Sequence, residues 1–396
     1  MIHDAIVIGA GPSGLIAADR IAKNGHTVIV LEEHKRIGEP DHCAGLLSST
    51  GLQKLDLIPP KEVIQNMVYG ARIHSPSGHS ILIERGQREA FVVDRKLFDS
   101  WLGDRAHDSG VQILTDYKVK GLRGTPDGHY SIDTPREERF ARAIIDAEGS
   151  RCQISGGVGL PQVPRQSKYP AYQYEVSGVD IDEDIVEMFY GRHISTGFFS
   201  WIIPLSDGRA RVGIASRDRS KQRLNAAMKH HPVMQNRLKN AIIERGFGGI
   251  VLVGLPVKRT VAGGFLVVGD AAGIVKATTG GGVVVGGTAS KIAGDIVSEA
   301  ISNQDGKLIL DKYESKWRSA LQRELQTMYL AQRAITSFSD RGLDELVKGA
   351  HEMGLLDIVK KEGDMDMQGR VIFSLLKNPK MILLGLKSIR YLNPFL

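Results

Sequence analysis

Two short apolar runs flank a glycine-rich turn and an amphipathic stretch at the start of the chain. Residues 5–8 read AIVI and residues 28–31 read VIVL. Short apolar runs bounded by turn residues are typical of strands buried in a parallel sheet. The segment between them spaces its apolar residues as a helix does. The pattern therefore predicts a strand, a turn, a helix and a second strand.

The turn in this unit has the G-x-G-x-x-G spacing, with glycines at Gly9, Gly11 and Gly14. Gly9 allows a tight turn, Gly11 lets the backbone approach a pyrophosphate, and Gly14 lets the helix pack closely on the strand. Glu32 follows the second strand, where a carboxylate that binds ribose is expected. The combination predicts a dinucleotide site rather than an unrelated glycine-rich loop.

The pattern changes in the second half of the chain. Residues 172–176 and 209–214 alternate with a period of two, which predicts an antiparallel sheet over about 165–255. Residues 301–396 follow helical spacing instead, with helices expected over 312–330, 343–353 and 367–392. The last of these is basic and amphipathic, so it could either cap a core or lie in a membrane interface.

Composition narrows the classes of protein that remain. The chain has 396 residues, two cysteines and a net charge of +6. Two cysteines argue against a disulfide scaffold, and we expect a cytoplasmic protein with no signal peptide and no transmembrane helix. The sequence has no run of basic residues that would indicate a nucleic-acid-binding protein. The positive charge would favour anionic lipid or an acidic protein partner, although an ordinary solvated surface explains it equally well.

A second glycine motif indicates which dinucleotide is bound. An apolar strand, Phe265–Val268, leads into Gly269 and Asp270, and three glycines at 280–282 then open a helix. This arrangement resembles the second FAD fingerprint of flavoproteins of the glutathione reductase and hydroxybenzoate hydroxylase types. The resemblance implies that Asp270 binds the ribityl chain and that the helix points its positive end at the flavin, where it would stabilise the reduced anion.

Two shorter segments resemble further motifs of the same flavoproteins. Residues 91–99 resemble "V-x-R-x-x-F-D", which implies that Arg95 lies near the FAD phosphates, and residues 144–150 resemble "D-A-D-G-x-x-S" with Glu148 in place of the second Asp. FAD is thus the expected cofactor, and no metal site is expected. The expected cofactor contacts are Gly9, Gly11, Pro12, Ser13, Gly14, Glu32, Glu33, Cys43, Ala44, Gly45, Arg95, Val119, Asp270, Gly280, Gly281, Gly282 and Val283.

Three segments are similar to motifs of the geranylgeranyl reductase family, whose members saturate isoprenoid double bonds of lipids with reduced FAD. Residues 37–48 resemble its loop beside the flavin, with Cys43 at the family cysteine. Residues 196–204 resemble "P-x-x-Y-x-W-x-F-P", and residues 363–366 resemble a C-terminal "G-D-x-D" region. The family resemblance implies an α/β fold. It combines a Rossmann-type, hydroxybenzoate hydroxylase-like FAD-binding domain (1–160 and 256–300), an antiparallel-sheet substrate domain (161–255) and a C-terminal helical region (301–396).

The resemblance also implies the reaction. FADH⁻ would deliver hydride from N5 to one alkene carbon, and a protein acid or water would protonate the other. Cys43 is the candidate catalytic residue, whereas His42 is more simply an exposed loop residue. Phe199, Trp201 and Pro204 are the candidate substrate contacts, although Phe199 lacks the hydroxyl of the family tyrosine.

The expected partners are a prenylated lipid and an electron donor such as ferredoxin or NAD(P)H, with peripheral membrane contact left open. Three alternatives stay open: an FAD-dependent monooxygenase, a reductase of a prenyl quinone or prenyl diphosphate, and a flavoprotein that only shuttles electrons. The monooxygenase would require oxygen, whereas the reductase would turn over without it.

Overall fold

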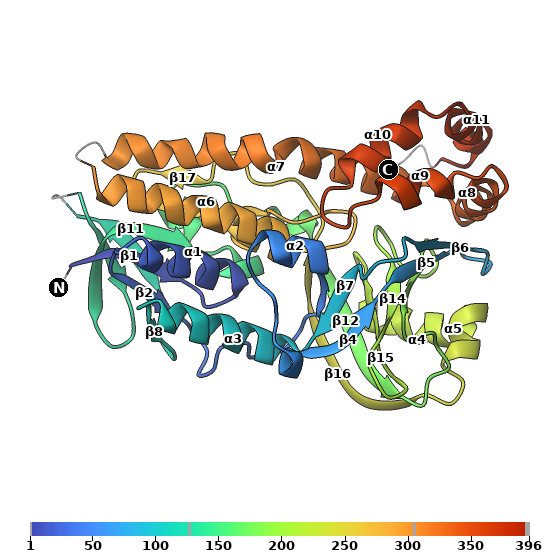
Figure 1. Cartoon of the computed structure of the whole chain (residues 1–396), viewed down its shortest axis with the longest axis horizontal. Coiled ribbons are helices and arrows are strands. Elements are labelled where there is room, and N and C mark those ends of the chain that lie inside the picture. Colours follow the sequence, from blue (N-terminus) through green and yellow to red (C-terminus); the bar gives the residue numbers. More distant parts are fainter. Residues whose placement is uncertain (1, 126–127, 304–305, 393–396) are drawn as a thin grey trace. The chain divides into compact units, whose positions relative to one another are not determined.

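The computed structural model describes residues 2–125, 128–303 and 306–392, and the chain forms two compact units (Figure 1). The first unit comprises Met1–Asp41, Arg95–Ser167 and Leu252–Leu325, and the second comprises His42–Asp94, Lys168–Val251 and Gln326–Leu396. The segment His42–Asp94, which the sequence placed within the FAD-binding part, groups with the second unit. The functional division into FAD-binding, substrate and helical parts stays a prediction.

The first unit is built on an eight-stranded sheet with a parallel centre. β1 (Ile2–Ile8) lies between β2 (Val28–Leu31) and β11 (Glu138–Asp146), and all three run parallel. β8 (Gln112–Leu114) and β18 (Phe265–Val267) extend the parallel part. The antiparallel strands of this sheet are β9 (Gly121–Gly124), β10 (Tyr130–Asp133) and β17 (Val261–Ala262). The central apolar runs are buried, as their composition predicts.

Helices cover this sheet. α1 (Pro12–Lys23) starts at a proline, whose fixed φ suits the first helical position. It packs against both α3 (Arg95–Asp108) and α6 (Val283–Ile301) (Figure 1). A Cβ at Gly294 of α6 would lie 2.9 Å from the carbonyl oxygen of Ala17, so a glycine is needed for this close approach. The strand–turn–helix–strand unit at the N-terminus and the helix after the second glycine motif are both confirmed.

The second unit contains two sheets. The larger has seven strands in the order β16-β12-β15-β14-β13-β5-β6, and the smaller has the order β3-β7-β4. β13 and β5 run parallel, whereas the pairs β12–β15, β13–β14, β14–β15, β5–β6, β3–β7 and β4–β7 are antiparallel. The bounds are β3 (Leu46–Ser48), β4 (Ile64–Val68), β5 (Gly70–His74), β6 (Ser80–Glu84), β7 (Ala90–Val93), β12 (Lys168–Ser177), β13 (Ile185–Phe189), β14 (Ser200–Pro204), β15 (Arg209–Ala215) and β16 (Ile242–Leu252).

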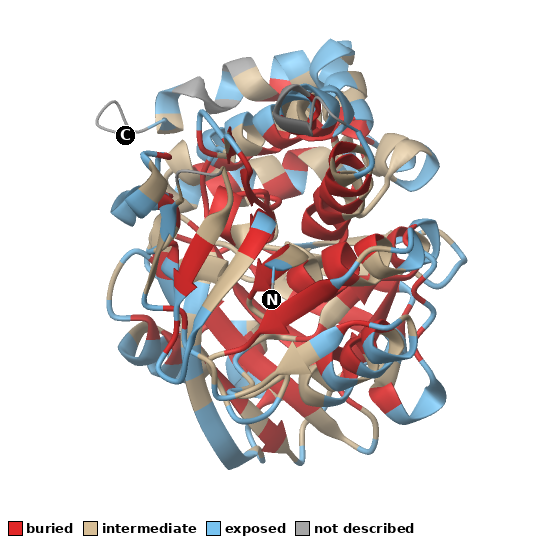
Figure 2. Ribbon diagram, turned by 90° about the vertical axis from the view of Figure 1, so that its left-hand side faces the viewer, coloured by how far each residue is buried: buried red, intermediate tan, exposed pale blue. Residues whose placement is uncertain are grey.

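The two faces of the larger sheet differ in chemistry. On β15, Ala210, Val212 and Ile214 alternate into an apolar core, which α4 (Ser220–His230) and α5 (Pro232–Arg237) complete. Buried stretches of the strands are red in Figure 2. The period of two places Arg211 and Gly213 on the opposite face. The antiparallel sheet predicted from this alternation is confirmed.

The remaining helices are α2 (Ser49–Lys54), α7 (Gly306–Ser337), α8 (Asp340–Glu352), α9 (Leu356–Glu362), α10 (Gly369–Lys377) and α11 (Pro379–Ser388). The single helix expected over 367–392 is wrong, because the chain is extended at Asn378. A residue that precedes proline avoids helical dihedral angles, and Pro379 then starts a new helix. Among the described residues, no helix is long and apolar enough to cross a membrane.

Candidate active site

The first glycine turn has the shape that a phosphate-binding loop requires. Gly9 has φ +98°, and a Cβ there would lie 2.5 Å from the carbonyl oxygen of Ala147. A Cβ at Gly14 would lie 2.0 Å from the carbonyl oxygen of Gly9. Gly11 is different, because a Cβ there would meet no atom within 4 Å. The strand and helix therefore need the outer two glycines, while open space lies beside the middle one.

Glu32 closes this turn from the end of β2. Its Oε2 accepts a hydrogen bond from Ala10 N at 2.8 Å, and its Oε1 accepts one from His34 N at 2.9 Å. The side chain is largely buried. Glu32 is thus fixed beside the glycine turn, where the sequence placed a ribose-binding carboxylate.

The two glycine motifs, about 260 residues apart in sequence, meet within the first unit. A Cβ at Gly269 would lie 2.3 Å from the hydroxyl oxygen of Ser13, and a Cβ at Gly286 would lie 2.9 Å from the same atom. Ser13 follows Pro12 at the start of α1, and Gly286 lies in the first turn of α6. The N-terminal ends of two helices therefore come together, and both ends favour negative charge.

Asp270 and the glycine run lie side by side at the start of α6. A Cβ at Gly282, the N-cap of the helix, would lie 2.5 Å from Oδ1 of Asp270. The preceding turn is closed by hydrogen bonds from Gly280 N to Lys276 O at 2.7 Å and from Lys276 N to Gly281 O at 3.1 Å. Val283 is the first residue of the helix. A carboxylate and free backbone N–H groups are thus held together at one helix end.

These residues fit FAD. Open space beside Gly11 lets a pyrophosphate approach the backbone, and a Cβ at that position would project into this space. Asp270 offers a carboxylate for a polyol, and the N-terminus of α6 offers a positive end for the reduced ring. The first unit therefore contains elements suited to bind the phosphates, a ribose and the ribityl chain of FAD. The contact of each individual residue with FAD stays a prediction.

Other predicted cofactor residues of the first unit lie in ion pairs or in the core. Arg95 begins α3 and donates from Nε and Nη2 to Asp99 at 3.0 and 2.9 Å. Glu33 pairs with Arg151 at 2.5 Å and Lys118 at 3.5 Å. Val119, also a predicted cofactor residue, is buried and lies in the segment that connects β8 to β9.

Glu148, which replaces the short carboxylate of the family motif, is used locally. Its Oε1 accepts a hydrogen bond from Ile154 N at 2.7 Å, and its own N donates to Asp146 Oδ1 at 3.1 Å. Burial, and then the charge of Glu148, raise the pKa of Asp146. The longer side chain therefore stabilises the turn after β11.

The ionisation of Asp270 gives a prediction for stability. Desolvation raises its pKa from 3.8 to about 6, although the charge of Arg95 opposes the shift. The unfolded chain loses this proton near pH 4, while the folded state keeps it until about pH 6. The free energy of unfolding therefore falls as the pH rises through this window. As the pH rises from 4 to 7, we expect the free energy of unfolding of Asp270→Asn to increase by about 1–3 kcal/mol relative to that of the FAD-free wild type. Urea unfolding at both pH values measures this, and a difference independent of pH would contradict it.

The loop that carries Cys43, Ala44 and Gly45 lies in the second unit and leads into β3. Cys43 is a free thiol of intermediate exposure, and His42 is exposed. Gly45 has φ +74°, and its carbonyl oxygen accepts a hydrogen bond from Val93 N at 2.8 Å. A Cβ at Gly45 would lie 2.3 Å from the carbonyl oxygen of Val93. This loop therefore packs against β7 without room for a side chain.

Arg211, which the sequence analysis did not single out, holds the same loop. Its side chain has no solvent exposure. Nη1 donates to the carbonyl oxygens of Ala44 at 2.9 Å and Val93 at 3.1 Å. Nη2 donates to Gln65 Oε1 at 2.6 Å, and Nε donates to Glu175 Oε1 at 3.0 Å. One guanidinium thus joins four segments of the second unit beside Cys43.

The candidate substrate strand is buried along its length. Every residue of β14, including Pro204, is buried, and Phe199 packs edge-on to Trp201 with ring centroids 6.0 Å apart. Trp201 lies over Gly213, where a Cβ would be 2.6 Å from its Nε1. That Nε1 has no hydrogen-bond partner among the described residues. A row of aromatic rings and one unsatisfied donor therefore occupies the face that also carries Arg211.

The signal for Arg211 was present in the sequence but not specific. A charged residue on a strand that alternates RARVGI is expected to face solvent, and Arg209 two positions earlier carries the same charge. Only the tertiary structure shows which arginine meets buried carbonyl groups. The segment 363–366, which the sequence placed in the C-terminal helical region, forms the loop between α9 and α10.

Comparisons with known proteins agree with this architecture. The family model described as lycopene cyclase protein matches residues 4–339. The chain is 30% identical to digeranylgeranylglycerophospholipid reductase 2 of Methanopyrus kandleri, over 97% of this chain and 100% of the relative. It is also similar to the crystal structure of a geranylgeranyl bacteriochlorophyll reductase-like protein from Thermoplasma acidophilum. The TM-score is 0.85 and the identity 26%, over 98% of this chain and 99% of that one.

A more distant likeness shows the fold alone. The structure of halogenase PltM in complex with phloroglucinol and FAD aligns with a TM-score of 0.70 at 14% identity, over 99% of this chain and 97% of that one. The predicted hydroxybenzoate hydroxylase-like fold and FAD as cofactor are confirmed. The chain therefore belongs to the lycopene cyclase protein family and is an FAD-dependent oxidoreductase of the geranylgeranyl reductase type.

Proposed function

We propose that the protein saturates C=C bonds of geranylgeranyl groups in archaeal-type membrane lipids. The observation that carries the proposal is the full-length similarity to a relative named digeranylgeranylglycerophospholipid reductase. When bound, reduced FAD supplies a hydride to one alkene carbon, and a proton completes the saturation at the other.

Residues of the first unit have a binding role in this proposal. The glycine turn at Gly9 and Gly11 and the start of α1 bind the phosphates through backbone N–H groups. Asp270 binds the ribityl chain. The N-terminus of α6, with its positive end, favours negative charge near the reduced ring. The positive end of the helix would stabilise the two-electron reduced form of FAD and would not act on the substrate.

Residues of the second unit orient the substrate. A trisubstituted alkene has no carbonyl group that a hydrogen bond could polarise, so positioning and exclusion of water must provide much of the catalysis. The aromatic rings of Phe199 and Trp201 are buried and held in fixed positions, because they pack on one another and Trp201 packs on Gly213. Both are suited to contact a prenyl chain.

Cys43 is the proposed catalytic residue, with its Sγ next to the alkene carbon that gains the proton. The surrounding loop supports this assignment, because Gly45 and the carbonyl of Ala44 are held by Val93 and Arg211. A side chain on a loop with fixed backbone loses little entropy when it is placed against a substrate.

Cys43→Ala is expected to lower turnover about 100-fold while FAD content stays at the wild-type level, because the thiol contacts substrate and not the fold. A positioned general acid contributes about this much. Bound FAD per chain and single-turnover rates measure the two effects separately. His42→Ala is the matched control, since the neighbouring side chain is exposed. Full turnover in Cys43→Ala would remove the residue from the mechanism.

The nature of the lipid can be tested directly. Protein reduced with dithionite is mixed anaerobically with a digeranylgeranylglyceryl phospholipid, a geranylgeranylated quinone or geranylgeranyl diphosphate, and the products are analysed by mass spectrometry. The proposal expects gains of two hydrogen atoms per bond with the phospholipid. Product formed only from the quinone or the diphosphate would move the activity to that substrate. Ferredoxin and NAD(P)H are then compared as electron donors in place of dithionite.

A further inference from the structure

The C-terminal helices α10 and α11 expose apolar side chains that a folded protein normally buries. Leu376 is 59% exposed, Ile382 50% and Leu383 49%, and Phe373 is also exposed. Phe373 and Leu376 are three positions apart on α10 and so share one face. The two helices pack on one another, which places these side chains on neighbouring elements.

The charge of the same segment has one sign. Residues 369–392 contain no Asp or Glu. Their basic residues, all of them exposed, are Arg370, Lys377, Lys380, Lys387 and Arg390. Arg370 lies 4.0 Å from Glu362, and Lys380 Nζ donates to the carbonyl oxygen of Met353 at 2.9 Å. A stretch that combines exposed apolar groups with an excess of positive charge complements a surface that is both apolar and anionic.

The opposite sides of these helices are already used inside the second unit. Val371 of α10 and Leu384 of α11 are buried. A Cβ at Gly349 of α8 would lie 2.4 Å from Leu384 Cδ1, so α8 and α11 are in close contact. The exposed apolar residues therefore are not needed for the packing of α11 on α8. Of the two roles left open by the sequence, capping a core accounts for only one face.

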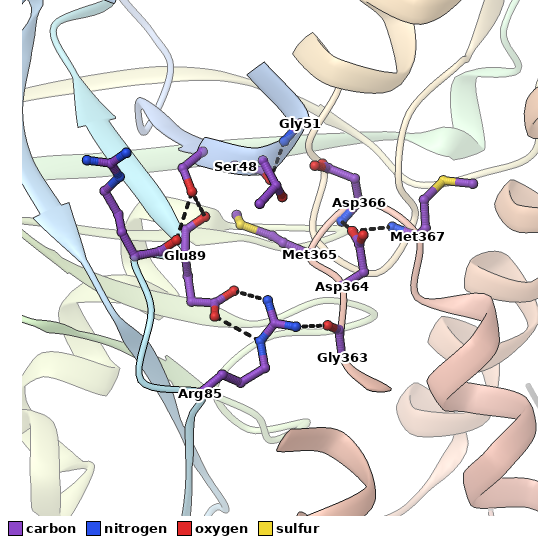
Figure 3. Close-up of polar contacts among 12 residues, drawn as sticks. Ser48, Gly51, Arg85, Glu89, Gly363, Asp364, Met365, Asp366 and Met367 are labelled. Carbon is purple, nitrogen blue, oxygen red and sulfur yellow. Dashed lines mark hydrogen bonds and ion pairs between the residues drawn. The ribbon is translucent and has the colours of Figure 1, made fainter. Parts of the chain in front are cut away.

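Polar contacts hold the helices in place. Asp344 of α8 accepts hydrogen bonds from the Ser77 N at 2.9 Å and the Ser77 hydroxyl at 2.7 Å. Figure 3 shows Arg85, paired with Glu89, donating to the carbonyl oxygen of Gly363 between α9 and α10. Ser339 N, at the N-cap of α8, donates a hydrogen bond to Tyr391 O at 2.9 Å. These contacts fix the segments that carry the exposed apolar residues within the second unit.

We propose that the exposed faces of α10 and α11 dock on the surface of a lipid bilayer that contains anionic lipid. The apolar side chains would enter the boundary between headgroups and acyl chains, and the lysines would contact the lipid phosphates. The docking goes beyond the proposed reaction and does not depend on it.

The test is flotation of the FAD-loaded full chain with vesicles. We expect the wild type to float with vesicles of phosphatidylglycerol and phosphatidylcholine, and the bound fraction to fall as salt rises from about 0.05 M to about 0.5 M. The triple variant Leu376→Gln, Ile382→Gln and Leu383→Gln should bind at least tenfold more weakly. Replacing Lys377, Lys380 and Lys387 by Gln should abolish the difference between anionic and neutral vesicles.

The chain provides a matched control. Ile58, Ile242 and Leu330 are even more exposed than the three residues of the variant but lie outside α10 and α11. Their replacement by Gln should leave flotation unchanged. The docking surface is overturned if the wild type does not float, or if both triple variants bind as the wild type does. The docking surface is also overturned if the wild type is a dimer in size-exclusion chromatography and the only effect of the α10–α11 apolar variant is to make it monomeric.

Lipid reduction in detergent micelles separates this inference from the proposed function. If docking is correct, the α10–α11 apolar variant fails on vesicles but keeps wild-type activity on micellar substrate. Flotation without any lipid product in either system would instead contradict the proposed function and leave the docking surface supported.

Discussion

Replacing Arg211 by Met is expected to lower the free energy of unfolding by about 3–5 kcal/mol, because the change removes the donor of two carbonyl groups, of Gln65 Oε1 and of one Glu175 oxygen at a site with no solvent exposure. Glu175 loses its contact at 3.0 Å, and the carbonyl oxygens of Ala44 and Val93 lose theirs. Urea unfolding of FAD-loaded protein measures the effect. Since the same guanidinium fixes the Cys43 loop, we also expect the rate of Cys43 alkylation to change.

Arg245 provides the matched control because it pairs with the same carboxylate from an exposed position. Its Nε and Nη2 contact Glu175 at 2.6 and 2.7 Å, while 43% of its side chain is exposed. Arg245→Met should therefore cost less than about 1 kcal/mol. Equal losses in the two variants would show that Arg211 contributes only as one member of a surface ion pair.

Replacing Gly11 by Ala is expected to weaken FAD binding about 100-fold without loss of stability in the FAD-free protein. The new methyl group meets no protein atom within 4 Å, but it occupies the space through which phosphate oxygens reach the backbone. The loss of one or two charge-assisted hydrogen bonds corresponds to ~2.7 kcal/mol, or 100-fold in affinity. Quenching of FAD fluorescence gives the dissociation constant.

Two other glycines make this prediction specific. Gly157→Ala is a control, since that position also has open space and lies outside the glycine turns. Gly14→Ala should lose stability as well as FAD, because its Cβ would lie 2.0 Å from the carbonyl oxygen of Gly9. Normal FAD affinity in Gly11→Ala would contradict the location of the pyrophosphate.

The structural features that the sequence predicted correctly are those that depend on short segments of the chain. The glycine spacing at 9–14, the apolar strands on either side and the helix after Gly282 are local patterns, and the structure contains all of them. The resemblance to family motifs also predicted FAD as the cofactor and the type of fold. The position of Asp270 beside Gly282 followed from the same motif, because only twelve residues separate them.

Contacts between distant segments could not be predicted in this way. Arg211 contacts residues 44, 65, 93 and 175, and no spacing in the sequence marks these four as neighbours. The grouping of His42–Asp94 with the second unit depends on strand pairing such as β5 with β13. The break between α10 and α11 was predictable from Pro379, but the apolar periodicity on both sides concealed it.

The most direct test of the central claim is a single anaerobic turnover. Protein with fully reduced FAD is mixed with digeranylgeranylglyceryl phospholipid, and flavin absorbance and lipid mass are followed together. We expect that one C=C bond gains two hydrogen atoms for each flavin oxidised. Flavin that stays reduced until air enters, followed by a lipid that gains oxygen or does not change, would contradict it.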